Sequence, residues 1–142
     1  MASDDSLSHI GRTSSVIGAF FEVYNSLGYG YLERVYSAAL ELELKTLGHR
    51  VGREVSVAIS YKGRVLARQR LDMIVDNVIV VEIKAGPALP PGSLRQLYSY
   101  LRGTNLAIGL LLHFGPQPIV KRAERRGAKL GPVNAVDDEK KR

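Results

Sequence analysis

The chain of 142 residues is long enough for one hydrophobic core and too short for two ordinary domains. Apolar residues make up 45% of it and charged residues 24%, as in a globular protein, and the net charge of +6 favours a polyanionic partner. Because it has no cysteine and only three histidines, disulfides, thiolate zinc sites and cysteine nucleophiles are excluded, and any metal is expected to be a hard cation with oxygen ligands.

The two ends of the chain are polar. Residues 1–9 include Asp4 and Asp5 and lack a basic segment followed by an apolar one, so no secretory signal is expected and the expected compartment is the cytoplasm. No apolar stretch reaches the length of about 18 residues that a membrane helix needs. Residues 1–9 and 126–142 are expected to be flexible, which leaves one domain over residues 10–125.

Two helices are predicted ahead of the first strand. Apolar residues recur at helical spacing over residues 12–27 and again over 31–47. Gly28 and Gly30 separate the helices, and Gly48 stands where a left-handed cap would end the second. The side chains expected in the core are Val16, Ile17, Phe20, Phe21, Tyr24 and Leu27 from the first helix, and Leu32, Val35, Tyr36, Ala39, Leu40 and Leu47 from the second.

The pattern then changes to that of β-strands. Residues 51–61 and 64–75 flank a turn signal at Lys62-Gly63, which predicts a hairpin. Residues 78–84 are apolar on both faces until Glu82, which indicates a central strand covered on both sides.

The rest of the chain completes an α/β pattern. A loop with three prolines leads to a predicted helix over residues 93–102, then a strand over 106–114 and a short edge strand over 119–123. The main order α-α-β-β-β-α-β predicts a mixed β-sheet core flanked by helices, with a right-handed crossover between the strands at 78–84 and 106–114.

Glu82 and Lys84 are unusual because they carry charge on what should be the most buried strand. Buried charges are costly unless they are paired or bound to a metal. Two positions apart on a strand, the two side chains project to the same face. Asp72 lies on the preceding predicted strand, across the turn at Asp76 and Asn77.

The length of that turn decides whether Asp72 meets Glu82. With a two-residue turn, Asp72 faces Val81 and the two carboxylates lie on opposite faces of the sheet. With a three-residue loop, Asp72 stands directly opposite Glu82. Such loops are common and need a left-handed residue, which Asp76 or Asn77 tolerates, so we expect the carboxylates to lie side by side.

Two adjacent carboxylates repel each other unless a cation lies between them. Mg²⁺ or Mn²⁺ suits Asp72 and Glu82 as oxygen ligands, and the backbone carbonyl of Ile83 is a further candidate ligand. Lys84 would then contact a phosphate or orient the attacking water. The alternative is a buried ion pair between Lys84 and one of the carboxylates, without catalysis.

This pattern resembles a known signature. Asp72 followed by Glu82-Ile83-Lys84 at a strand end is similar to the D…(D/E)xK motif of the PD-(D/E)XK nuclease superfamily, with Leu71 in place of the proline in that name. The resemblance covers residues 10–123 and implies a restriction-endonuclease-like fold.

Two further motifs strengthen the resemblance. Gln96 and Tyr100 match the QxxxY motif of the RecB-like exonuclease branch, on the helix after the central strand. Gly30, Glu33 and Tyr36 match the GxxExxY motif of a bacterial family assigned to the superfamily. Without the resemblance, Glu33 would be an acid favoured by the helix dipole, and Gln96 and Tyr100 would be the polar edge of an amphipathic helix.

The resemblance implies an Mg²⁺- or Mn²⁺-dependent endonuclease or exonuclease that acts on DNA. The alternative is a catalytically inactive module on the same fold that binds nucleic acid or protein. Sequence specificity is expected to be low, or to come from a homodimer or a partner protein. The implied site residues are Asp72, Glu82, Lys84, Glu33 and Gln96 for catalysis; Asp72, Glu82, Ile83 and Glu33 for the metal; Gln96, Tyr100, Arg70 and Arg95 for nucleic acid; and Tyr36 as support.

Overall fold

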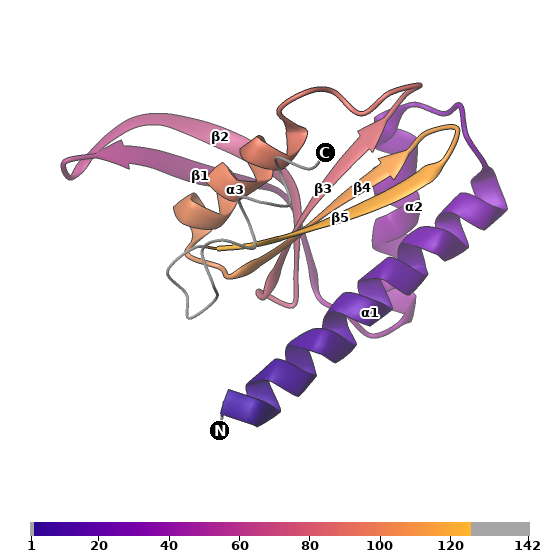
Figure 1. The fold of residues 1–142 in the computed structure, drawn as a ribbon, viewed down its shortest axis with the longest axis horizontal. Coiled ribbons are helices and arrows are strands. Elements are labelled where there is room, and N and C mark those ends of the chain that lie inside the picture. Colours follow the sequence, from indigo (N-terminus) through magenta and orange to yellow (C-terminus); the bar gives the residue numbers. More distant parts are fainter. Residues whose placement is uncertain (1, 126–142) are drawn as a thin grey trace.

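The computed structural model describes residues 2–125, which form a five-stranded sheet with three helices (Figure 1). The sheet order is β1-β2-β3-β4-β5; β3 and β4 are parallel and the other neighbours antiparallel. The predicted α/β fold with a mixed sheet flanked by helices is therefore confirmed. The elements are α1 (Ala2–Leu27), α2 (Glu33–Thr46), β1 (Val51–Tyr61), β2 (Arg64–Val75), β3 (Ile79–Ala85), α3 (Ser93–Thr104), β4 (Ile108–Phe114) and β5 (Pro118–Glu124).

Helix α1 begins earlier than the sequence pattern predicts. It starts at Ala2 rather than near Arg12, and so contains most of the segment 1–9 that is expected to be flexible. The apolar periodicity marks only the part of a helix that packs on a core, whereas no proline in residues 2–11 prevents the helix from extending further. The predicted flexible segment 126–142 lies outside the described residues.

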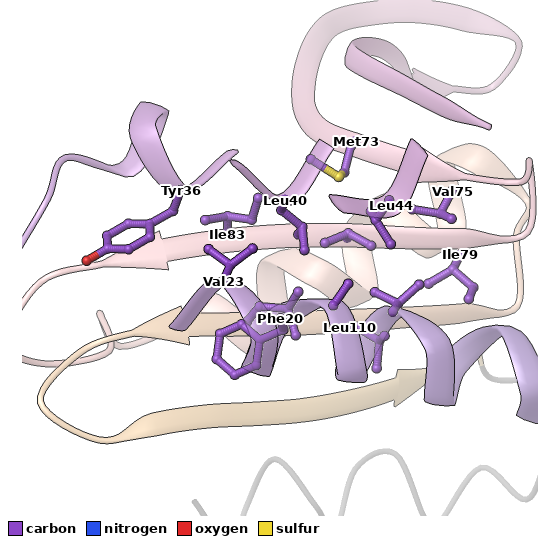
Figure 2. Close-up of a cluster of buried hydrophobic side chains, with 14 of the residues drawn as sticks. Phe20, Val23, Tyr36, Leu40, Leu44, Met73, Val75, Ile79, Ile83 and Leu110 are labelled. Carbon is purple, nitrogen blue, oxygen red and sulfur yellow. The ribbon is translucent and has the colours of Figure 1, made fainter. Parts of the chain in front are cut away.

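Helices α1 and α2 cover one face of the sheet. Tyr36 of α2 stacks on Phe114 of β4 with ring centroids 4.1 Å apart, and Phe20 of α1 meets Phe114 edge-on at 4.7 Å. Figure 2 shows the aliphatic side chains that fill the space between the helices and the strands, among them Val23, Leu40, Leu44, Met73, Val75, Ile79, Ile83 and Leu110.

Three predicted core positions are wrong. Leu32 and Leu47 are 63% and 51% exposed, because α2 is shorter than predicted and these residues cap its two ends. Phe21 is 38% exposed, because it lies beside the stripe of α1 that faces the sheet. Leu44, which the prediction omits, is fully buried one turn after Leu40.

Helix α3 covers the other face and joins the parallel strands β3 and β4. It approaches the sheet closely because residue 103 is glycine: a Cβ there would lie 2.4 Å from Cγ1 of Val57. A second buried cluster lies beneath α3 and contains Val57, Leu71, Val80, Leu97, Leu101 and Leu111.

His49 connects three separate segments at one end of the sheet. Its Nε2 lies 2.7 Å from Oγ of Ser15 on α1, and its Nδ1 lies 2.7 Å from Oδ2 of Asp76. The Arg50 N–H donates to Oδ1 of Asp76 (2.8 Å). The order of groups is that of a hydrolase triad, but Ser15 lies inside a helix, where the backbone N–H groups bond within the helix and none is free beside it as an oxyanion donor. The cluster therefore acts as a structural link.

Asp76→Asn is expected to reduce the free energy of unfolding by about 1–2 kcal/mol near neutral pH. Burial raises the pKa of the Asp76 carboxyl, but the hydrogen bonds from His49 and Arg50 outweigh it and hold the pKa below its usual range. A lowered pKa in the folded state stabilises the fold above the unfolded pKa, and this stabilisation is lost as the pH falls through the folded pKa. Thermal melting of both proteins over that pH range tests this, and a difference that does not change with pH contradicts it.

Candidate active site

The loop between β2 and β3 sets the register of these two strands. Residues 76–77 both adopt the left-handed conformation, with φ of 55° and 57°. Beyond the loop, Val75 pairs with Ile79 and the next pairs follow without a shift. The three-residue loop expected from the sequence is thus confirmed, and its register directs Asp72 towards Glu82.

The backbone pairing of β2 and β3 ends with Met73 and Val81. At Asp72 and Glu82, hydrogen bonds from backbone to side chain connect the two strands instead. The backbone N–H of Asp72 donates to Oε1 of Glu82 (3.0 Å), and the backbone N–H of Ile83 donates to Oδ2 of Asp72 (2.7 Å). Each carboxylate therefore accepts a hydrogen bond from the opposite strand, and the two acids are brought together between β2 and β3.

The two acids ionise less readily than free carboxyl groups. Glu82 is only 4% exposed, and burial, followed by the negative charge of Asp72, raises its pKa to about 8. Burial also raises the pKa of Asp72, although the Ile83 N–H and the charge of Lys84 act in the opposite direction. A cation bound at these carboxylates would offset both effects.

Lys84 lies near the end of β3, on the same face as Glu82. Its Nζ is 4.0 Å from Oε2 of Glu82 and donates to Oε1 of Gln96 at 3.5 Å. Gln96 lies in the first turn of α3, so this helix fixes the direction in which the lysine side chain extends. The sequence leaves two alternatives for Lys84, a catalytic role or an ion pair with a carboxylate. The structure contains the ion-pair contact with Glu82, and the catalytic role stays a prediction.

Tyr100 follows Gln96 by one helical turn. Its hydroxyl donates to the carbonyl oxygen of Arg70 at 3.5 Å, which connects α3 with β2 just before Asp72. Burial, followed by the charges of Glu82 and Asp72, raises the pKa of Tyr100. The two QxxxY residues on α3 thus contact both strands that carry the acidic residues: Gln96 contacts Lys84 of β3, and Tyr100 contacts Arg70 of β2.

Glu33 approaches the acids from the first turn of α2. The residue is exposed overall, but partial burial of its carboxyl group, followed by the charge of Asp72, raises its pKa. Glu33 and Asp72 line a cavity of about 410 Å³ together with Arg34, Arg53 and Glu54.

Tyr36 positions the segment that precedes Glu33. Its ring is fully buried, its hydroxyl donates to the Gly28 carbonyl oxygen (2.5 Å), and it accepts a hydrogen bond from the Tyr31 N–H (3.2 Å). Tyr36 thus holds the turn between α1 and α2, and its supporting role at the site stays a prediction.

The arginines predicted to bind nucleic acid are both exposed. Arg70 lies on β2 and forms an ion pair with Glu54 at 3.3 Å, and Arg95 lies in the first turn of α3. Their contacts with a substrate stay predictions.

Glu54 is a site residue that the sequence analysis missed. It has a left-handed backbone with φ of 52°, and β1 and β2 lack a paired residue at this point, between the pairs of Arg53 and Val55. Glu54 lines the same cavity as Glu33 and Asp72. The available signal was the polar pair of Arg53 and Glu54, which interrupts the alternation of the predicted strand.

The donor set fits a hard divalent cation. Asp72 and Glu82 would provide two carboxylates, the backbone carbonyl of Ile83 stays a predicted ligand, and water and substrate phosphate commonly fill the remaining positions around Mg²⁺. Among the side chains that the structure describes, no three of His, Cys, Asp or Glu gather as a ready-made metal site.

The chain belongs to the PD-(D/E)XK nuclease superfamily, whose sequence model matches residues 11–126. A solved structure titled "Crystal structure of SSO0001" is similar in fold, with a TM-score of 0.53 and 24% sequence identity. The similarity covers 75% of this chain and 56% of that one, so this chain spans little more than half of its length. No curated protein matches the sequence.

Superfamily membership and the α/β architecture support a restriction-endonuclease-like fold. In the part of the chain that the structure describes, no helix combines the length and apolar character that crossing a membrane requires.

Proposed function

We propose that the protein is an Mg²⁺- or Mn²⁺-dependent nuclease that hydrolyses phosphodiester bonds in DNA. The observation that carries this proposal is the pairing of Asp72 with Glu82. A buried carboxylate at Glu82 and a half-buried one at Asp72, both with raised pKa values, make a site that gains from binding a cation. Lys84 beside them supplies the positive group that phosphodiester chemistry needs near the scissile bond.

Each residue of the site has a distinct role in this proposal. Asp72, Glu82 and the carbonyl of Ile83 hold the ion, which when bound lowers the pKa of a water molecule and stabilises charge on the phosphate. Lys84 orients the attacking water or contacts the scissile phosphate. Gln96 holds Lys84 in place, and Glu33 reaches the ion or its water from α2.

The finer assignment to the GxxExxY family and the RecB-like branch rests on contacts of the motif residues. Oε1 of Gln96, in the QxxxY motif, accepts a hydrogen bond from Nζ of Lys84, and Tyr100 contacts β2. Tyr36 of the GxxExxY motif supports the turn before Glu33. We infer that both motifs serve the same site.

One observation favours the alternative of an inactive module that binds nucleic acid or protein. Both carboxylates already accept hydrogen bonds from the backbone of the opposite strand, which is a structural role that needs no catalysis. In that case the fold would retain its substrate surface without hydrolysing the bond.

A nuclease assay separates the two functions. Plasmid, linear duplex, single-stranded DNA and RNA are each incubated with the protein in Mn²⁺, Mg²⁺ or EDTA. We expect cleavage of DNA with either metal and none in EDTA; plasmid cleavage identifies endonuclease activity, and cleavage only of linear DNA identifies exonuclease activity. Binding without cleavage in either metal would reject the nuclease and support the module.

A further inference from the structure

Strands β1 and β2 extend beyond the body of the molecule as a two-stranded ribbon (Figure 1). Their pairing continues out to Tyr61 and Arg64, whereas β2 pairs with β3 only over residues 73–75. We call residues 58–70 the arm. Residues 64–70 are exposed throughout, and at about 3.3 Å per residue the stretch from Arg64 to Asp72 is roughly 26 Å long.

The arm carries only positive charge. It contains Lys62, Arg64, Arg68 and Arg70 and no aspartate or glutamate. The ion pair of Arg70 with Glu54 at its base is exposed on both sides and therefore weak. The ion pairs of the described chain do not include Arg64 or Arg68. A surface of this kind attracts a polyanion.

Arg68 and Arg70 lie on one face of the arm, two positions apart on β2. Arg70 pairs with Ser56 and Arg68 with Ala58, so small side chains flank both guanidinium groups. The neighbouring position Val57 points the other way and packs on Gly103 of α3. The arm thus presents Arg68 and Arg70 together on one face, on the part of β2 that leads towards Asp72.

We propose that the arm binds duplex DNA in its major groove and thereby makes duplex DNA the substrate of the adjacent site. This inference rests on the proposed nuclease function. The major groove is about 12 Å wide and admits a two-stranded ribbon, with basic side chains reaching the phosphates on either side. The major groove of duplex RNA is too narrow and deep for side chains to enter. A length of roughly 26 Å corresponds to about 8 base pairs.

A second copy of the chain fits the arm less well. Tyr61, Val65 and Leu66 near the tip are exposed and apolar, which would favour association. However, Lys62 and Arg64 would bring like charges together in such a pairing, and the bulge after Ile59 disturbs the strand edge.

Binding in EDTA tests the arm separately from cleavage. The affinity for a duplex of about two helical turns is measured at several salt concentrations for wild type, Arg64→Ala, Arg68→Ala and the control Lys45→Ala. Lys45 lies at the far end of α2 in an ion pair with Glu41, and its loss changes the net charge equally. Each arm variant is expected to bind more weakly and to reduce the slope of log K against log salt by about 1, and Lys45→Ala to match wild type.

Three results would overturn the inference: equal affinity of wild type for duplex DNA, duplex RNA and single-stranded DNA; arm variants that bind like the Lys45→Ala control; or a dimer in sedimentation that Leu66→Ser abolishes. Because EDTA prevents metal-dependent cleavage, failure of the arm appears in binding. If the nuclease proposal fails, the wild-type protein does not cleave DNA when metal is present. The two failures are therefore distinguishable, because one is seen in binding and the other in cleavage.

Discussion

Lys84→Ala is expected to lower the rate of DNA cleavage by roughly a thousandfold while the protein stays folded. The substitution removes the positive group beside the scissile phosphate. It also removes a charge that lowers the pKa of Glu82, so this carboxyl ionises less readily and holds a cation less well. The fold should tolerate the change, because the side chain lies near the end of β3 and is 22% exposed.

Single-turnover cleavage in Mn²⁺ and a melting curve measure the two effects of Lys84→Ala. Lys84→Arg is the matched control: it keeps the charge, but its planar guanidinium does not reproduce the lysine geometry, so we expect a partial recovery at most. Gln96→Ala should reduce the rate less than Lys84→Ala, because Gln96 acts through Lys84. Wild-type cleavage by Lys84→Ala would show that this lysine is structural only.

Mn²⁺ at a hundredfold excess over its Kd is expected to raise the melting temperature of wild type by roughly 9 °C. A ligand that binds only the folded state stabilises it by about 2.7 kcal/mol at that excess, and a domain of this size gains about 3 °C per kcal/mol. Asp72→Asn should abolish most of the shift. Its amide oxygen can still accept the Ile83 N–H, so the strands stay connected while the ligand charge is lost. An equal shift in both proteins would place the metal elsewhere.

The same experiment in EDTA should depend on pH through Glu82. Its pKa is raised from the usual 4.5 to about 8 in the folded state, so ionisation is less favourable there than in the unfolded chain. Stability without metal should therefore fall as the pH rises through the range between these values, and Mn²⁺ should reduce the fall. Glu82→Gln, which does not ionise, should remove this contribution to the pH dependence.

The sequence predicts the element order well, because the apolar periodicity changes clearly from helix to strand near residue 51. The choice between the two registers of β2 and β3 depends on a short loop, and the tolerance of Asp76 and Asn77 for the left-handed conformation favours the correct one. The exposure of Leu32 and Leu47 at the ends of α2 could not be predicted in this way, because apolar periodicity does not show which turn of a helix is the last to pack on the core.

The candidate site was only partly accessible from the sequence. Asp72, Glu82 and Lys84 stand out because charge interrupts apolar strands, and the structure brings them together. Glu54 gives a weaker signal, the polar pair with Arg53 on a strand that is only partly buried, and the three-dimensional arrangement places it in the cavity with Glu33. The arm could not be predicted either, because the sequence indicates a hairpin but not how far the hairpin extends beyond the sheet.

The reciprocal hydrogen bonds between Asp72 and Glu82 also affect how this chain would change under mutation. Alanine at Asp72 removes the acceptor of the Ile83 N–H, and alanine at Glu82 removes that of the Asp72 N–H, so either change leaves a backbone donor without its partner at a cost of about 1–3 kcal/mol. The hydrogen bond of Lys84 is made to a side chain, so its loss leaves no backbone donor without a partner. A lineage that no longer needed hydrolysis would therefore lose the lysine first and keep the two acids for the sake of folding.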